Sequence, residues 1–464
     1  MKKAQLGFLT LIALIILLPV CFFQHEKNHW SEIDNRNLAE LSENVSIDQT
    51  AQELKSYVNE RIGFRYQMID AYNRINKTLF HVFSHPDYDL GKEEELYPNI
   101  IENQLYDSYR QTFVVALEKM QHYCEDRGIK FYLMFDPNKI SIYPEYIPDG
   151  VNYSSEWVDR FLEECANRGI TVVDNYHYFK EIKDEVKLYN SKEDVAHWND
   201  MGAFLGCNHV LRTLKEDFPA IEENRLEEME VSEETVKYLQ NSNIVINETV
   251  PRIRVPEHWV NIGEAEREAL QKDATFANSA HFVSTSESDS SKPKILAFEG
   301  SYLYGGNHHA FLINQSREYI TIHNYRNVLN LPYYVNVYQP DLVLFDVAEF
   351  VFAEYFFASS TMGNMIYPEA IKVYPYAEEE ISLKSVEITE FTPAFRRIFV
   401  EVDSTDYQPA YVEFNGKTYD LEIVNGVYHL VTLSSNLEGV SELKFTFIDE
   451  TNQKRYTAVH RLGE

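Results

Sequence analysis

The chain has 464 residues, of which 44% are hydrophobic and 14% aromatic, so it can bury more than one substantial core. This composition excludes an intrinsically disordered protein, and two or three domains are expected. The formal charge of −31, from 42 basic and 73 acidic residues, would repel a polyanion and argues against nucleic acid as a partner. The four cysteines form no Cys-x-x-Cys motif, and neither a metal nor a cofactor is expected.

The N-terminus is expected to attach the protein to a membrane. Two lysines precede an apolar run from about Leu6 to Phe23 that is nearly long enough to cross a bilayer. No small-residue cleavage site follows, so residues 1–26 are predicted to be an uncleaved single-pass signal anchor, with the rest of the chain outside the cytoplasm. Cys21 leaves a lipoprotein as the less favoured alternative, because the preceding residue is a large valine. Residues 27–100 are expected to form a helical stalk packed on the core.

Residues 101–375 alternate between helix and strand patterns. Apolar side chains repeat at helical spacing in 113–124, 157–165 and 204–218, and a glycine ends each of the first two stripes. Short, nearly all-apolar runs are typical of strands buried on both faces, and they occupy 129–135, 170–173, 295–298, 319–323 and 342–347. This alternation implies crossover connections, and therefore an α/β domain with a mostly parallel sheet flanked by helices.

Two segments depart from that alternation. Residues 219–293 are acidic and then serine-rich, which predicts an insertion or lid with a flexible exit at Ser284–Ser291. From about 380 to 464 the hydrophobic period changes to two, and Asn415-Gly416 and Asn425-Gly426 are strong type I′ hairpin signals. This tail is predicted to be a small all-β sandwich, and a carbohydrate-binding role for it is an analogy.

Two short motifs carry residues suited to acyl chemistry. Asp194 and His197 are three positions apart, so the carboxylate can bind one ring nitrogen and fix the tautomer of the other. Ser301 follows Gly300 at the carboxyl end of the strand 295–298, the edge at which open parallel sheets bind ligands. Each motif alone is more often an ordinary surface pair or turn. Their joint occurrence at sheet-edge positions makes the three residues a candidate catalytic triad.

The sequence around His197 resembles a known family. Residues 194–202, Asp-Val-Ala-His-Trp-Asn-Asp-Met-Gly, are similar to the Asp-x-(x)-His-Trp signature of the AlgX/AlgJ-like acyltransferases and the related DHHW proteins, which are SGNH hydrolase-like. Weaker similarity covers most of 30–350, and the order of Asp and His before Ser also resembles that family. The resemblance implies an SGNH-like fold and serine O-acyl transfer, usually of acetyl, with Ser301 as nucleophile, His197 as general base and Asp194 as its orienter.

The resemblance also implies partners. The acceptor would be a cell-surface polysaccharide or another envelope polymer, and a multipass membrane acyltransferase would deliver the acyl group across the bilayer. An acyl esterase of the same fold stays open as an alternative, because water and a sugar hydroxyl compete for one acyl-enzyme. A non-catalytic surface glycan-binding or scaffold protein also stays open, because Gly300 replaces the aspartate that more commonly precedes the family's serine.

Position suggests further contributors to the site. The backbone N–H of Tyr302 and the side chain of Asn307 are candidates for stabilising an oxyanion, with a loop cap as the alternative for Asn307. Lys139, after a predicted strand, would either bind substrate or solvate the sheet edge. Trp198 is expected to shield His197 by packing, with sugar stacking as the alternative. The two histidines 308 and 309 are expected at a solvated helix start, with a role in the cleft as the alternative.

Overall fold

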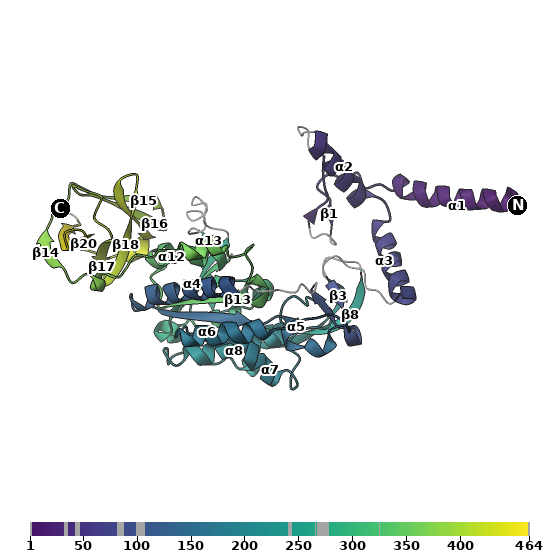
Figure 1. Cartoon of the computed structure of the whole chain (residues 1–464), viewed down its shortest axis with the longest axis horizontal. Helices are drawn as coiled ribbons and strands as arrows, with labels where there is room; N and C mark the ends of the chain where they lie inside the picture. The colour runs from purple at the N-terminus through teal and green to yellow at the C-terminus, as the bar shows by residue number, and fades with distance from the viewer. Residues whose placement is uncertain are drawn as a thin grey trace.

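A seven-stranded sheet forms the core of the computed structural model (Figure 1), and its order is β6-β5-β13-β11-β12-β10-β9. Neighbours from β6 to β12 are parallel, and β10 at the far edge is antiparallel to both of its neighbours, β12 and β9. The prediction of a mostly parallel sheet is therefore confirmed. The strands are β5 (Lys130–Asp136), β6 (Val172–Asp174), β9 (Trp259–Asn261), β10 (Asn278–Ser284), β11 (Lys294–Glu299), β12 (Glu318–His323) and β13 (Leu342–Ala348). The structure describes residues 2–31, 36–41, 47–80, 88–98, 107–239, 244–264, 266, 278–323 and 325–462.

Helices flank this sheet in two groups of neighbours, with α4 beside α6 and α13, and α8 beside α7 and α11. The predicted apolar stripes are buried, apart from the partly buried Phe218 beyond the end of α8; in α4 the stripe consists of Phe113, Leu117, Met120 and Cys124. The Asn199 side chain accepts a hydrogen bond from the amide of Gly202 at 2.8 Å and caps the start of α8. The helices are α4 (Asp107–Glu125), α5 (Lys139–Ile142), α6 (Glu156–Asn167), α7 (Asn175–Ile182), α8 (Asp200–Leu214), α10 (Ser301–Tyr304), α11 (Ala310–Ile313), α12 (Leu331–Tyr338) and α13 (Ser359–Gly363).

The insertion at 219–293 is built differently from the expected lid. It begins with an antiparallel hairpin of β7 (Glu230–Tyr238) and β8 (Val245–Arg254), and it then supplies β9 and β10 to the edge of the main sheet. Its serine-rich exit was expected to be flexible, but it is a short turn around the buried Asp289. The Ser284 hydroxyl and the Lys292 ammonium bind that carboxylate at 2.6 and 2.9 Å, which fixes the turn. Part of this insertion lies outside the described residues.

The N-terminal region contains α1 (Lys2–Cys21), α2 (Ile47–Arg61) and α3 (Arg65–Ile75), which Figure 1 shows standing away from the α/β domain. The hairpin of β3 (Tyr88–Leu90) and β4 (Leu96–Pro98) packs on that domain, because Leu96 is buried beside residues of the insertion. The stretches of the predicted stalk near residues 81–87 and 99–100 lie outside the described residues. None of the described helices is long and apolar enough to cross a membrane, and the anchor stays a prediction.

The C-terminal region is a β-rich domain with its own buried core. Its eight strands follow the order β14-β21-β20-β17-β18-β19-β16-β15. Asn415-Gly416 and Asn425-Gly426 both have positive φ and close the β17–β18 and β18–β19 hairpins, so both hairpin predictions are confirmed. The strands are β14 (Ala377–Glu380), β15 (Ser385–Thr392), β16 (Phe395–Glu401), β17 (Ala410–Phe414), β18 (Lys417–Val424), β19 (Val427–Leu433), β20 (Glu442–Asp449) and β21 (Lys454–Arg461).

A buried polar cluster joins this domain to the α/β domain. Arg127, after α4, forms an ion pair with Asp420 of β18 at 2.6 Å, and the two side chains are 9% and 4% exposed. The Tyr123 hydroxyl donates to the same carboxylate at 2.7 Å. The Asn336 side chain donates to the carbonyl of Asp420 and accepts from its amide, at 2.9 and 3.0 Å. Both domains therefore share one buried carboxylate.

Removing that carboxylate should destabilise the protein. We expect Asp420→Ala to lower the free energy of unfolding by about 3–5 kcal/mol, because it leaves the Arg127 guanidinium buried without its counter-charge. The matched control is Glu379→Ala, which removes an exposed ion pair with Lys454 and should cost at most about 1 kcal/mol. Urea unfolding of both variants measures the difference, and equal effects would contradict the interface described above.

Candidate active site

Ser301 lies where β11 ends and α10 begins, at the carboxyl edge of the parallel strands. The strand before it is fully buried between β12 and β13, which fixes the position of this turn. The amide of Gly300 donates to Asp346 of β13 at 2.9 Å. The serine side chain itself is only partly buried, so the turn presents a hydroxyl at the surface of the sheet edge.

The structure brings the three predicted triad residues together. His197 Nδ1 lies 2.8 Å from Asp194 Oδ1, and His197 Nε2 lies 2.9 Å from Ser301 Oγ, although the serine is 104 positions away in the chain. The imidazole and the carboxylate are 23% and 33% exposed. A carboxylate that orients an imidazole, which in turn contacts a hydroxyl, is the arrangement that activates a serine nucleophile.

Asp194 holds an unusual backbone conformation. Its φ is +41°, in the left-handed region, which L-residues other than glycine seldom adopt and which aspartate tolerates better than most. The carbonyl of Asp194 accepts from the amide of His197 at 3.1 Å, so the two residues lie in one tight turn. This turn places both side chains on the same side, and it requires support from the surrounding structure.

Trp198 packs beneath the histidine, as expected. It is 2% exposed, and its indole N–H donates to the carbonyl of Tyr302 and to His308 Nδ1, both at 3.0 Å. A Cβ atom at Gly206 would lie 2.6 Å from the indole ring, so glycine there makes room for it. The Tyr302 ring packs edge to face against the His197 ring, with ring centres 5.3 Å apart. Because Trp198 is buried, sugar stacking on it is excluded.

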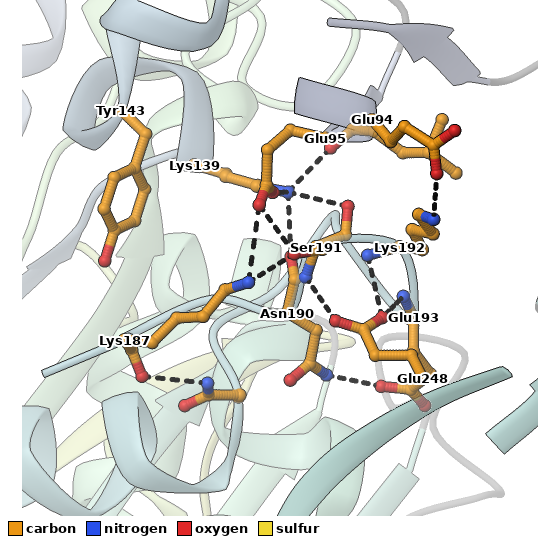
Figure 2. Close-up of polar contacts among 12 residues, drawn as sticks. Glu94, Glu95, Lys139, Tyr143, Lys187, Asn190, Ser191, Lys192, Glu193 and Glu248 are labelled. Atoms are coloured by element: carbon orange, nitrogen blue, oxygen red, sulfur yellow. Dashed lines mark hydrogen bonds and ion pairs between the residues drawn. The ribbon is translucent and has the colours of Figure 1, made fainter. Parts of the chain in front are cut away.

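Lys139 is buried, so it does not solvate the sheet edge, and its substrate-binding role stays a prediction. Its side chain is 2% exposed, and its ammonium donates to the carbonyls of Leu96, Asn190 and Ser191 at 2.8, 2.8 and 3.1 Å (Figure 2). It also pairs with Glu95 at 2.7 Å. Burial lowers the pKa of Lys139 to about 8, against the opposing effect of the Glu95 carboxylate. The β3–β4 hairpin covers this position, which the sequence pattern did not indicate.

The two oxyanion candidates are placed differently. The amide of Tyr302 belongs to the first turn of α10, where no intrahelical acceptor exists, and its role stays a prediction. Asn307 is exposed in a turn and has φ of +60°, a position that suits a loop residue. Among the described contacts, its side chain makes no hydrogen bond to His197 or Ser301.

His308 and His309 are buried, at 6% and 5% exposure, and the prediction of a solvated helix start is wrong. His308 accepts the indole N–H described above. His309 Nδ1 lies 3.0 Å from a carboxylate oxygen of Glu299, which is itself fully buried at the end of β11. Both histidines are therefore committed to contacts beneath the turn that carries Ser301.

A buried carboxyl pair escaped the sequence analysis. Asp136, at the end of β5, and Asp346 of β13 are both fully buried, and each carboxyl affects the ionisation of the other. Asp346 accepts from the amide of Gly300, and Asp136 accepts from the Asn175 side chain at 2.8 Å. Burial raises the pKa of each carboxyl, that of Asp346 to about 6, which favours a proton shared by the pair. The available signal was an acid directly after one apolar run, Asp136, and an acid inside another, Asp346.

The expectation that no metal is bound overlooked one pattern that is typical of zinc sites. The segment His25-Glu26-Lys27-Asn28-His29 has the His-Glu-x-x-His pattern, whose zinc-binding form needs both histidines on one face of a helix. Here the segment is a loop after α1, and His29 Nδ1 contacts Glu26 at 3.1 Å. Within the described ranges, no group of three or more metal-ligating side chains is arranged to hold an ion.

The carboxyl pair makes stability depend on pH. Because folding raises both pKa values, the stability provided by the shared proton is present at acid pH and is lost as the pH rises through the folded-state values. In Asp136→Asn, the amide can still accept from Asn175 and can donate to an ionised Asp346. We therefore expect this variant to gain stability over the wild type by about 1 kcal/mol or more between about pH 5 and about pH 8.

Urea unfolding at both pH values measures this gain, with the exposed Asp184→Asn as the matched control. A difference between Asp136→Asn and the wild type that stays constant or shrinks with rising pH would contradict the shared proton.

Comparison with known proteins agrees with the expected family. Residues 98–294 match the family model described as "SGNH hydrolase-like domain, acetyltransferase AlgX", a range that includes Asp194 and His197 and ends before Ser301. Bacillus cereus PatB1 is similar in structure, with 13% identity, a TM-score of 0.45 and coverage of 57% of this chain and 96% of that chain. A search among curated proteins found no match.

Two further solved structures are similar at comparable levels. The O-acetyltransferase domain of Pseudomonas putida AlgJ has 13% identity and a TM-score of 0.41, and the match covers 58% of this chain and 92% of that chain. Pseudomonas aeruginosa AlgX has 14% identity and a TM-score of 0.38, with coverage of 78% and 89%. The family match confirms the resemblance found around His197: residues 98–294 are similar to the SGNH hydrolase-like acetyltransferase domain described for AlgX.

Proposed function

We propose that the protein is a serine O-acyltransferase, most directly an O-acetyltransferase, that modifies a cell-surface polysaccharide or another envelope polymer. The observation that carries this proposal is the continuous path from Asp194 through His197 to Ser301, with both contacts below 3 Å. The family match to an acetyltransferase domain supports the choice of acyl group. Asp194, His197 and Ser301 are the proposed triad.

The geometry accounts for both halves of an acyl transfer. Ser301 Oγ attacks the carbonyl carbon of the acyl donor while His197 Nε2 takes its proton, and Asp194 stabilises the resulting imidazolium. His197 returns this proton to the leaving group, and the acyl group stays on Ser301 as an ester. The imidazole then takes the proton of an acceptor hydroxyl, which attacks the ester carbonyl, and His197 returns that proton to Ser301 Oγ as the acylated acceptor leaves. The Tyr302 amide and the Asn307 side chain are the proposed oxyanion donors.

An exposed aromatic ring beside the nucleophile favours a sugar acceptor. Tyr304 lies one helical turn after Ser301 and is 43% exposed. One of its faces stacks on His323, with ring centres 4.0 Å apart and planes 11° apart. Burial lowers the pKa of His323, and the neutral imidazole contacts the carbonyl of Glu299 at 3.2 Å. The ring of Tyr304 is thus held rigidly, as stacking on a sugar requires.

The proposed location is the outer face of a cell membrane, with the N-terminal segment as a single-pass anchor. The apolar run of the sequence supports this location, and large apolar side chains of α1 such as Leu6, Phe8 and Leu9 are more than 60% exposed. A multipass membrane acyltransferase is the proposed source of the acyl group. Fractionation of cells that produce the full chain tests the location.

The triad predicts a specific pattern of lost activity. We expect Ser301→Ala and His197→Ala each to lower kcat for a chromogenic acetyl ester by about 10³-fold or more, because each removes a group that acts in the reaction. A fluorophosphonate should label the wild type at Ser301. The matched control is His177→Ala, since His177 also contacts an aspartate three residues before it, Asp174, and should be dispensable.

Full turnover in either triad variant would refute the enzymatic proposal, and absent labelling would favour a glycan-binding protein. If added sugar acceptor does not reduce the rate at which the ester is hydrolysed, the protein is better described as an esterase than as a transferase.

The acceptor proposal has its own test. We expect Tyr304→Ala to raise KM for a polysaccharide acceptor about fivefold while cleavage of a small acetyl ester changes by less than about twofold, because stacking is worth about 1 kcal/mol. Tyr304→Phe should behave like the wild type. The control is Tyr355→Ala, at a tyrosine that is 81% exposed. Equal losses with the acceptor and with the small ester would contradict a role in acceptor binding.

A further inference from the structure

We propose that the inserted β7–β8 hairpin holds the Asp194–His197 pair in place, and that Glu248 of β8 is its principal positioning residue. This inference rests on the proposed function, in which that pair activates Ser301. It replaces the expectation of a lid, because the hairpin contacts the segment before, within and after the pair.

Glu248 binds the loop that leads into Asp194. Its carboxylate accepts hydrogen bonds from three successive amides, those of Ser191, Lys192 and Glu193, at 2.6, 2.8 and 2.7 Å (Figure 2). Three N–H groups directed at one carboxylate form charge-assisted bonds that are shorter and stronger than bonds between neutral groups. The backbone immediately before Asp194 is therefore fixed by a side chain from another part of the chain.

The carbonyl groups of the same loop are fixed from the opposite side. Lys139 binds the carbonyls of Asn190 and Ser191, and Glu95 pairs with that ammonium and accepts from the Ser191 hydroxyl at 2.6 Å (Figure 2). The loop is neither helix nor strand, so its backbone groups have no ladder partners. Glu248 supplies the acceptor for its amides, and Lys139 supplies the donor for its carbonyls.

The residue between the two catalytic candidates is held by packing. Val195 is fully buried in a small apolar cluster with Leu96 of β4 and Leu239, which follows β7. Ile246 of β8 also packs against this cluster. The hairpin therefore contacts the Asp-x-x-His turn itself through apolar side chains.

The far side of the turn is held by the same strand. Asp200, the first residue of α8, accepts from the amide of Ile253 at 2.8 Å. Arg252 lies 3.5 Å from Glu193 and 3.6 Å from Asp200, so one guanidinium spans the turn from end to end. Strand β8 thus binds before Asp194 through Glu248 and after His197 through Ile253.

This support matters because the backbone of Asp194 is left-handed. A conformation of that kind costs about 1 kcal/mol or more and persists where its surroundings impose it. If Glu248 were replaced by glutamine, one of its two acceptor oxygens would become an NH₂ donor. At least one of the amides of residues 191–193 would lose its acceptor, and the remaining bonds would lose their charge assistance. The carboxylate of Asp194 would then move relative to His197, and a displacement of about 1 Å in a catalytic group lowers turnover about a hundredfold.

The test compares Glu248→Gln with Glu233→Gln in the full chain, since Glu233 is an exposed glutamate on the partner strand β7. We expect Glu248→Gln to lower kcat for an acetyl ester about 10- to 100-fold with KM changed less than about threefold, and Glu233→Gln to have no effect. In an Asp194→Asn background, Glu248→Gln should cost less than about threefold more, because both changes act on one contact. A multiplicative loss, or no loss in the single variant, would overturn the proposal.

Hydrogen exchange gives a readout that does not depend on activity. Glu248→Gln should raise amide exchange in the peptide that contains residues 191–193 about tenfold or more and leave the rest of the α/β domain unchanged. Unchanged exchange there, or a rise throughout the domain, would overturn the local role of Glu248. If the wild type cleaves no acyl ester, the proposed function fails, while this exchange result still decides whether Glu248 holds the loop.

Discussion

The contact between His197 and Ser301 is the interaction on which the account depends. It joins the turn before α8 to the turn after β11, which are far apart in the chain, at a distance of 2.9 Å. It forms because β11 is buried between β12 and β13, which fixes the serine, and because α8 and Trp198 pack beneath the imidazole. The chemistry of the site is thus a consequence of how the sheet and one helix start meet.

Polar side chains, most of them buried, bear much of the support for this contact. Asp346 of the carboxyl pair holds the amide of Gly300, Lys139 holds carbonyls before Asp194, and the partly buried Glu248 holds amides in the same loop. Burying the carboxyl pair and Lys139 costs free energy, which hydrogen bonds and opposite charge offset. These side chains supply hydrogen-bond partners to loop backbone groups that have none in a helix or sheet. The irregular segment thereby becomes as rigid as a regular element.

Local signals in the sequence were sufficient for the framework and for the three central residues. Helix stripes, apolar strand runs and Asn-Gly turns depend on neighbours in the chain, and they predicted α4, α8, β11 and both C-terminal hairpins. Asp194 and His197 share a turn, and Ser301 follows the end of a clearly patterned strand, so the local position of each residue could also be predicted from the sequence. The family resemblance then indicated that the two segments meet.

The supporting residues could not be predicted because their partners come from distant segments. Lys139 has the sequence position of a strand-edge residue, but the β3–β4 hairpin covers it in the fold. Glu248 is one of many acidic residues in the insertion, so the sequence does not distinguish it from its neighbours. His308 and His309 were expected to be solvated, but His308 contacts Trp198 and His309 contacts Glu299. Burial of a charged side chain depends on tertiary contacts, for which spacing in a single sequence gives no signal.

The most direct measurement is capture of the acyl-enzyme. The full chain is mixed with an activated acetyl ester, quenched in acid within milliseconds to seconds, digested and analysed by mass spectrometry. The account predicts one acetyl group on the peptide that contains Ser301, formed no more slowly than turnover and absent from Ser301→Ala. Turnover without an acetyl group on that serine, or with the acetyl group on another residue at a competent rate, would contradict it.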